Sequence, residues 1–184
     1  RQPLYGVADI GRAKAEVAAE RLATLNRDVV LDAIATHATR ENVDGFVAGY
    51  DLVIECTDNF RAKFLVNDAV VRAGKPAVFA SVHQYEGQLQ VYRPEPDWPC
   101  LRCLWPEAPR DGLVGNCAEA GVLGPVPAAL GERLPQTLQA GDNQVEVTLE
   151  PIRDLGDTPL GRRRIIGITG GSFAGPRLSG RVLP

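Results

Sequence analysis

Two short segments of this 184-residue chain carry side chains whose types and spacing suit metal chemistry. Residues 56–59 read Cys-Thr-Asp-Asn, so that a carboxylate follows an apolar run. Residues 99–103 read Pro-Cys-Leu-Arg-Cys, which places two thiols at Cys-x-x-Cys spacing. Carboxylate oxygens suit hard cations such as Mg²⁺, whereas paired thiols suit Zn²⁺ or redox exchange.

The carboxylate of the first segment, Asp58, stands between a predicted strand and a predicted helix. Residues 51–56 have the composition of a short buried strand, and residues 59–73 that of a helix. Asp58 would therefore lie at the carboxyl end of a strand, where α/β proteins gather ligands, in a position suited to metal-bound phosphate. The cationic residues Arg1 and Lys14 near the start of the chain favour this role. A helix N-cap is the alternative role for Asp58.

The second segment is open to three interpretations. The thiolates of Cys100 and Cys103 can bind one face of a tetrahedral Zn²⁺, they can form a redox pair, or they can be two free cysteines in a loop. A complete zinc site needs two more ligands, and no cysteine follows Cys117. The pair is therefore a zinc half-site at most, and zinc would need ligands from outside it.

The elements around these segments alternate between helix and strand. This alternation predicts an α/β fold with a mostly parallel sheet and helices packed on its faces. Residues 87–92 then alternate with period two, as a half-exposed strand does. The predicted helices cover 11–25, 41–48 and 59–73, and the predicted strands 29–35, 51–56, 77–82 and 87–92.

Charge divides the chain unevenly. Twenty basic and 23 acidic residues give a net charge of −3, which argues against a general binder of nucleic acid or membrane surfaces. No apolar run reaches the roughly 18 residues that cross a bilayer. Residues 1–150 carry a net −7 and residues 151–184 a net +4, so we expect a boundary near 132–145.

Several motifs together resemble the middle of a ThiF/MoeB/HesA-type activating enzyme, a bacterial relative of ubiquitin-activating enzymes. They occur in order over residues 1 to about 130. They are Arg1-Gln2, Gly11-Arg12-Ala13-Lys14, Asp51-Leu52-Val53-Ile54-Glu55-Cys56-Thr57-Asp58-Asn59, Glu86-Gly87-Gln88, Pro99-Cys100-Leu101-Arg102-Cys103-Leu104 and Cys117-Ala118-Glu119-Ala120-Gly121-Val122-Leu123-Gly124-Pro125.

The resemblance implies a Rossmann-like fold and a reaction. In that family, ATP activates the C-terminal Gly-Gly of a ubiquitin-like sulfur-carrier protein as an acyl-adenylate, for example in thiamine or molybdopterin biosynthesis. The resemblance also implies a cytoplasmic homodimer. The alternatives are a non-catalytic module for carrier binding or dimerisation, and a zinc or redox protein using Cys100 and Cys103.

Site residues follow from the same resemblance. Arg1 and Lys14 are expected to contact the ATP phosphates, with Gln2 beside them. Asp58 would hold Mg²⁺, and Asn59 would line the nucleotide. In some family members a cysteine matching Cys117 forms a thioester or acyl-persulfide with the carrier, and in others it is dispensable.

The sequence departs from the family at both ends. The family's glycine-rich phosphate loop and first strand have no counterpart here, and neither does its second Cys-x-x-Cys. Because the loop supplies N–H donors to phosphate, we expect weak or no activity from this chain alone. Residues from about 145 to 184 resemble instead the opening of a bacterial family of small uncharacterised β-barrel proteins. The expected organisation is a partial adenylating domain (1–131), a linker (132–144) and a β-rich segment (145–184).

Overall fold

The computed structural model describes residues 3–110, 121–130, 144–146 and 165–169. The chain forms two compact units. The larger unit, here called the sheet unit, lies within residues 38–170. The smaller, here called the amino-terminal unit, contains residues 2–37.

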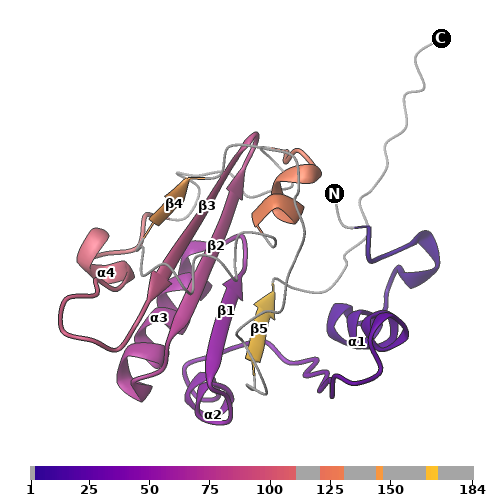
Figure 1. The fold of residues 1–184 in the computed structure, drawn as a ribbon, viewed down its shortest axis with the longest axis horizontal. Helices are drawn as coiled ribbons and strands as arrows, with labels where there is room; N and C mark the ends of the chain where they lie inside the picture. Colours follow the sequence, from indigo (N-terminus) through magenta and orange to yellow (C-terminus); the bar gives the residue numbers. More distant parts are fainter. Residues whose placement is uncertain (1–2, 111–120, 131–143, 147–164, 170–184) are drawn as a thin grey trace. The chain divides into compact units, whose positions relative to one another are not determined.

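The sheet unit is built on a five-stranded mixed sheet of order β4-β3-β2-β1-β5 (Figure 1). Strand β1 is parallel to both β2 and β5, whereas β3 is antiparallel to both β2 and β4. In chain order the elements are α2 (Val43–Ala48), β1 (Leu52–Cys56), α3 (Phe60–Ala73), β2 (Ala77–His83), β3 (Glu86–Tyr92), α4 (Leu101–Leu104), β4 (Gln144–Glu146) and β5 (Ile165–Thr169).

The predicted α/β class is confirmed, but the sheet is less parallel than expected. A crossover through α3 makes β1 and β2 parallel. Strands β2 and β3 are instead joined by only two residues, Gln84 and Tyr85, and so short a connection requires antiparallel pairing. The backbone of Gln84 has a φ of 50°, in the left-handed region that such tight turns often use.

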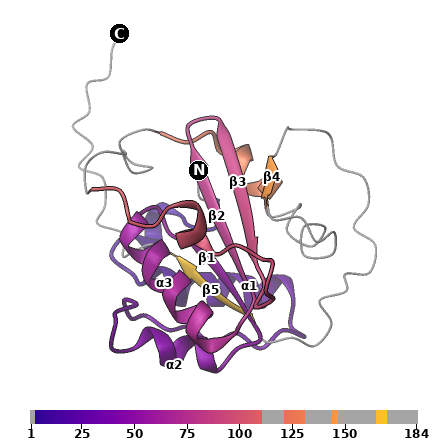
Figure 2. The same ribbon diagram turned by 90° about the vertical axis from the view of Figure 1, so that its left-hand side faces the viewer.

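Alternating residues of the strands form two apolar layers. On one face, Val53, Phe79 and Tyr92 pack against α2 and α3, which lie together on that face in Figure 2. On the other face, Leu52 and Val78 are among the residues that pack with Leu130. The period-two pattern of the sequence thus corresponds to burial on opposite faces.

Helix α3 has a well-defined signal at each end. The Asn59 side chain accepts a hydrogen bond from the Ala62 N–H at 2.8 Å and so caps the N-terminus. Gly74 ends the helix in the left-handed conformation, with φ 58°, and its N–H bonds to the carbonyls of Val70 and Val71. These signals fix where the helix begins relative to the end of β1.

The amino-terminal unit contains a 3₁₀ turn, η1 (Val7–Asp9), and the helix α1 (Lys14–Leu25). Asp9 accepts a hydrogen bond from Gly6 N–H and forms an ion pair with Arg21 at 2.6 Å. The helix predicted from residue 11 therefore begins three residues later, after this turn.

The strand predicted over residues 29–35 is wrong. These residues form no strand, and Val29 and Val30 are 50% and 91% exposed. A β-branched run becomes a strand only where another strand offers hydrogen bonds. No described strand pairs with residues 29–35. No helix among the described residues is long and apolar enough to span a membrane.

Gly87 of β3 offers a test of the packing on the second face. A Cβ at this position would lie 2.9 Å from a Val126 methyl group and 3.0 Å from Leu130 Cγ. We expect Gly87→Ala to lower the free energy of unfolding by about 1–3 kcal/mol, because the branched side chains of Val126 and Leu130 are buried and have little room to move. Urea denaturation measures the loss.

The matched control is Gly45→Ala in α2. There a Cβ meets no atom within 4 Å, and alanine favours helix by up to about 1 kcal/mol. Equal stability of the Gly87→Ala variant and the unmodified chain would contradict this packing.

Candidate functional site

Asp58 lies where the sequence predicts, in the turn between β1 and α3. The N-cap of α3 is Asn59 and not Asp58, so the alternative prediction of a capping role for Asp58 is wrong. The Asp58 side chain is exposed, and among the described residues it has no hydrogen-bond or ion-pair partner. An unpaired carboxylate at the carboxyl end of a parallel strand fits a hard cation.

A buried ion pair holds this turn in place. Glu55, the fourth residue of β1, is fully buried and its Oε2 lies 2.5 Å from Lys63 Nζ of α3. Lys63 Nζ also donates to the Ala80 carbonyl of β2 at 2.8 Å. One ammonium group therefore ties together the helix and two neighbouring strands.

The same carboxylate orients the start of the turn. Glu55 Oε1 accepts the Thr57 N–H at 2.7 Å, and Thr57 Oγ1 lies 3.4 Å from the Asn59 carbonyl oxygen. Burial raises the pKa of Glu55, whereas Lys63 and the Thr57 hydrogen bonds oppose that rise. The backbone before Asp58 is thus held by the Glu55 carboxylate, and the backbone after it by the Thr57 hydroxyl.

The predicted phosphate-binding residues lie in a different part of the chain from Asp58. Lys14 is the first residue of α1 in the amino-terminal unit, and its carbonyl accepts a hydrogen bond from the Tyr5 hydroxyl at 3.3 Å. Arg1 and Gln2 lie outside the described residues. The convergence of Arg1, Gln2 and Lys14 with Asp58 therefore stays a prediction.

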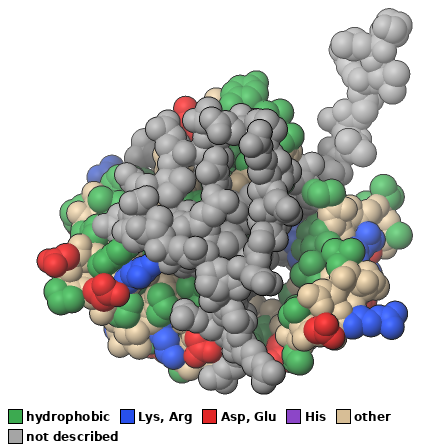
Figure 3. Space-filling model, viewed as in Figure 1, with side chains coloured by type: hydrophobic (Ala, Val, Ile, Leu, Met, Phe, Trp, Pro, Cys, Tyr) green, Lys and Arg blue, Asp and Glu red, His purple; other side chains and the backbone are tan. Residues whose placement is uncertain are grey.

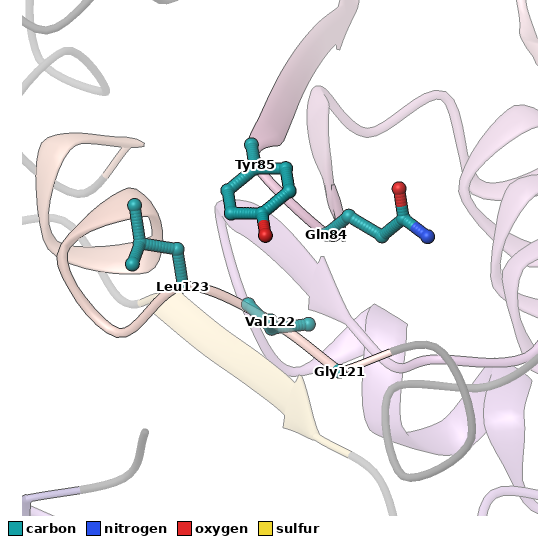
Figure 4. Close-up of a pocket in the computed structure, with 5 residues that line it drawn as sticks. All are labelled: Gln84, Tyr85, Gly121, Val122 and Leu123. Atoms are coloured by element: carbon teal, nitrogen blue, oxygen red, sulfur yellow. The ribbon is translucent and has the colours of Figure 1, made fainter.

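A pocket of about 340 Å³ lies beside the β2–β3 turn. Among the described residues, its polar side chains are the Gln84 amide and the Tyr85 hydroxyl, and no predicted site residue that the structure describes lines it. Figure 4 shows the Gln84 amide turned away from Tyr85 and Leu123. Backbone hydrogen bonds join the two sides of the pocket. The Gln84 N–H donates to the Gly121 carbonyl, and the Gln84 carbonyl accepts from the Leu123 N–H.

The thiols of Cys100 and Cys103 lie together, with their sulfur atoms 3.7 Å apart. Partial desolvation of Cys100 favours the neutral thiol. Hydrogen bonds from the backbone N–H groups of Cys103 and Arg102, and from the side chains of Cys103 and Asn67, outweigh it and lower the pKa of Cys100. No group of three or more His, Cys, Asp or Glu side chains that could hold a metal occurs within the described residues. Cys117 lies outside them.

Charged side chains on the described surface of the sheet unit are mixed in sign. Acidic and basic groups lie next to one another in Figure 3. Two exposed ion pairs of this unit, Arg72–Asp44 and Arg102–Asp68, have N–O distances of 2.6 Å. Each links α3 to a neighbouring segment.

Comparison with known proteins identifies the fold family. The ThiF family model matches residues 1–138, which is three quarters of the chain. The chain belongs to the ThiF family. A second model, of the DUF3237 proteins of unknown function, matches residues 141–184.

Relatives of the ThiF part are adenylyltransferases and activating enzymes by name. The sulfur carrier protein adenylyltransferase of Thermus thermophilus is 45% identical over 71% of this chain and 50% of its own length. The SAMP-activating enzyme E1 of Haloferax volcanii is 40% identical over 71% of this chain and 48% of its own length. The chain thus spans about half of each of these ThiF relatives.

A solved structure shares the fold at low sequence identity. The crystal structure of PaaA superposes with a TM-score of 0.57 and 14% identity, over 83% of this chain and 49% of that one. This likeness concerns the fold of the ThiF chain and not its activity.

The two residues that support the Asp58 turn were not predicted from the sequence. Glu55 and Lys63 were covered by a correctly predicted strand and helix, but neither was singled out. An acidic residue inside an apolar strand, followed eight residues later by a lysine in a helix, was the available signal. Asn67, which contacts the cysteine pair, offered no comparable signal.

The buried ion pair predicts that removing Lys63 alone costs more stability than removing the charges of both partners. Lys63→Met leaves Glu55 buried without its cation, and such losses cost about 3–5 kcal/mol. The free energy of unfolding should fall by that order in urea denaturation at pH 7. The double variant Glu55→Gln/Lys63→Met should recover a large part of the loss.

The same variant should acquire a pH dependence. Burial already raises the pKa of Glu55, and removing Lys63 raises it further. A carboxyl group with a raised folded pKa favours the folded state below its unfolded pKa, and that stability is lost as pH rises through the folded pKa. Lys63→Met should therefore be less destabilising near pH 5 than near pH 8.

Arg72→Met is the control for the loss of an ion pair. Arg72 and Asp44 are 54% and 60% exposed, so this change should cost less than about 1 kcal/mol. Equal effects of the Lys63→Met and Arg72→Met variants would contradict the role assigned to the buried pair.

Proposed function

We propose that this chain takes part in ATP-dependent adenylylation of the C-terminus of a ubiquitin-like sulfur-carrier protein. The match of the ThiF family to residues 1–138 carries the proposal. The names of the Thermus and Haloferax relatives, an adenylyltransferase for a sulfur carrier and an activating enzyme, support the substrate class.

The proposed reaction joins two anions. The carrier's terminal carboxylate attacks the α-phosphorus of ATP, pyrophosphate leaves, and an acyl-adenylate forms. The attacking carboxylate is already ionised, so the reaction needs positioning and positive charge more than it needs a base. Lys14 and Arg1 are the proposed cations at the phosphates, with Gln2 beside them and Asn59 at the nucleotide.

Asp58 is the proposed ligand for Mg²⁺. Its exposed, unpaired carboxylate suits that ion, which prefers carboxylate and phosphate oxygens. When bound, the ion would neutralise charge on the triphosphate. The contribution of the chain itself is the fixed turn, in which Glu55 holds the backbone at Thr57 and Asn59 caps α3.

Other parts of the expected enzyme also stay proposals. Homodimer formation and a carrier-linked intermediate at Cys117 rest on the family alone. The division into an adenylating part (1–131), a linker (132–144) and a C-terminal segment (145–184) also stays a proposal. Two family models that meet near residue 140 support a boundary there. Zinc likewise stays a proposal, because the two described thiols form a half-site that would need further ligands from outside it.

The Asp58→Asn variant tests the proposed magnesium ligand. Carrier-dependent exchange of labelled pyrophosphate into ATP measures the reverse of the proposed step. We expect weak exchange by this chain and a further loss of roughly 10²-fold in the variant, because a charge-stabilising group is removed. Folding should be unchanged, since this side chain is exposed and has no described partner.

Asp97→Asn is the matched control. Asp97 is also exposed, but it follows β3, whose last residue pairs with the first residue of β2. This is the opposite end of the strands from Asp58, so the loss of Asp97 should leave exchange unchanged. Carrier binding without any ATP-dependent exchange would favour the non-catalytic module instead.

The Lys14→Gln variant tests the proposed phosphate contact. If Lys14 contacts the triphosphate, the variant should bind ATP about tenfold or more weakly in a calorimetric titration and should lose exchange. Lys75→Gln, which alters a lysine two residues after the end of α3, is the control and should have no such effect. Loss of exchange in Asp58→Asn but not in Lys14→Gln would remove Lys14 from the site.

A further inference from the structure

The turn that carries Asp58 is closed by a ring of contacts that returns to α3. Glu55 Oε1 accepts the Thr57 N–H at 2.7 Å, and Glu55 Oε2 pairs with Lys63 Nζ. The Lys63 backbone N–H in turn donates to the Asn59 carbonyl at 3.2 Å. Lys63 is thus bonded directly to the residue after Asp58, and through Glu55 to the residue before it.

The ring is buried, whereas the residue that it encloses is not. Glu55 has no solvent exposure, and Thr57 and Lys63 are 6% and 7% exposed. Asp58 is exposed, and its side chain has no hydrogen-bond or ion-pair partner among the described residues. The fold therefore fixes the backbone around Asp58 while its carboxylate stays accessible to a cation from solution.

Helix stability does not account for the lysine in this ring. Lys63 is the fourth residue of α3, and the helix dipole favours carboxylates over cations in that first turn. A buried ion pair is also weak evidence of stabilisation, because apolar replacements of such pairs are often as stable. Apolar side chains cannot supply what this pair supplies, which is an acceptor for the Thr57 N–H and a cation that holds the acceptor in place.

We propose that Glu55 and Lys63 are positioning residues for a divalent cation at Asp58, an inference that rests on the proposed function. Removal of groups that orient a metal ligand without touching the metal commonly weakens metal binding by about 10- to 100-fold. Glu55 and Lys63 act on Asp58 in this way, through the backbone before and after it. The bond from Lys63 Nζ to the Ala80 carbonyl at 2.8 Å also ties the ring to β2, so the turn cannot move separately from the sheet.

Paramagnetic broadening by Mn²⁺ alone measures this positioning without any enzyme turnover. Mn²⁺ binds the same carboxylate oxygens as Mg²⁺, and it broadens the NMR signals of amides close to it. In the unmodified full chain, the Asn59 amide should broaden at a lower Mn²⁺ concentration than the Asp97 amide. Asp97 is exposed and lies outside the ring, so it is the internal reference for adventitious binding.

The test variant is Glu55→Gln/Lys63→Met, which removes both charges at nearly constant volume. Its urea midpoint should lie much closer to that of the unmodified chain than the midpoint of Lys63→Met does, since no charge is left buried alone. The Mn²⁺ concentration that broadens the Asn59 amide should nevertheless rise by about tenfold or more, because the ammonium group no longer holds the acceptor of the Thr57 N–H.

Val70→Ala is the matched control for stability. Val70 is fully buried near the other end of α3, and its truncation leaves a cavity that lowers the urea midpoint. The Mn²⁺ response of this variant should equal that of the unmodified chain. The loss of stability and the loss of cation binding should thus occur in different variants, which a merely structural role of the buried pair does not predict.

Amide hydrogen exchange in the unmodified chain is a second measurement and needs no variant. The Thr57 and Lys63 N–H groups close the ring, so each should exchange at least roughly 100-fold more slowly than in an open chain. Exchange at the open-chain rate would show that the turn opens while the protein stays folded. That result would overturn the proposal.

The Asp58→Asn variant separates failure of this inference from failure of the function on which it rests. If Asp58→Asn weakens the Mn²⁺ response but the Glu55→Gln/Lys63→Met variant responds like the unmodified chain, the pair does not position the ligand. The assignment of the cation to Asp58 then stands alone. If Asp58→Asn leaves the Mn²⁺ response unchanged, that assignment fails and the positioning role fails with it.

Discussion

The buried contact between Glu55 and Lys63 is the constraint on which the sheet unit depends. A carboxylate with no solvent exposure is costly unless its charge is matched, and Lys63 supplies that charge at 2.5 Å. Because Lys63 also bonds to the Ala80 carbonyl, α3 can occupy only one position over β1 and β2. Apolar packing of Val66 and Val70 alone would tolerate small shifts of the helix that this geometry does not.

The parts of the fold that the sequence predicted are those governed by local rules. Strand β1 and helix α3 were predicted within one residue at most ends, because apolar periodicity and the Gly74 stop signal are encoded within each segment. The strand predicted over 29–35 failed because strand formation depends on a partner elsewhere. For the same reason, the pairing of β5 with β1 could not be foreseen from residues separated by more than a hundred positions.

The candidate site divides in the same way. Placing Asp58 after a strand and before a helix required only local patterns, and the structure agrees. That the Asp58 side chain has no partner among the described residues was not predictable, because this depends on Asn59 taking the N-cap role. The buried supports at Glu55 and Lys63 are joined across eight positions and two element types, a contact that no single periodic pattern reveals.

Helix α3 is the common support for both chemical features of the sheet unit. Lys63 and Asn67 are four residues apart, so they lie on one side of the helix about one turn from each other. The first holds the strand that leads to Asp58, and the second holds the segment that carries Cys100. Both are buried polar residues whose hydrogen bonds run to backbone groups outside the helix.

Such contacts add little net stability, but they are costly to break, because the freed groups would stay buried without partners. They therefore fix position more than they add stability. This explains how a helix with a largely apolar buried side can still hold two polar sites in defined places.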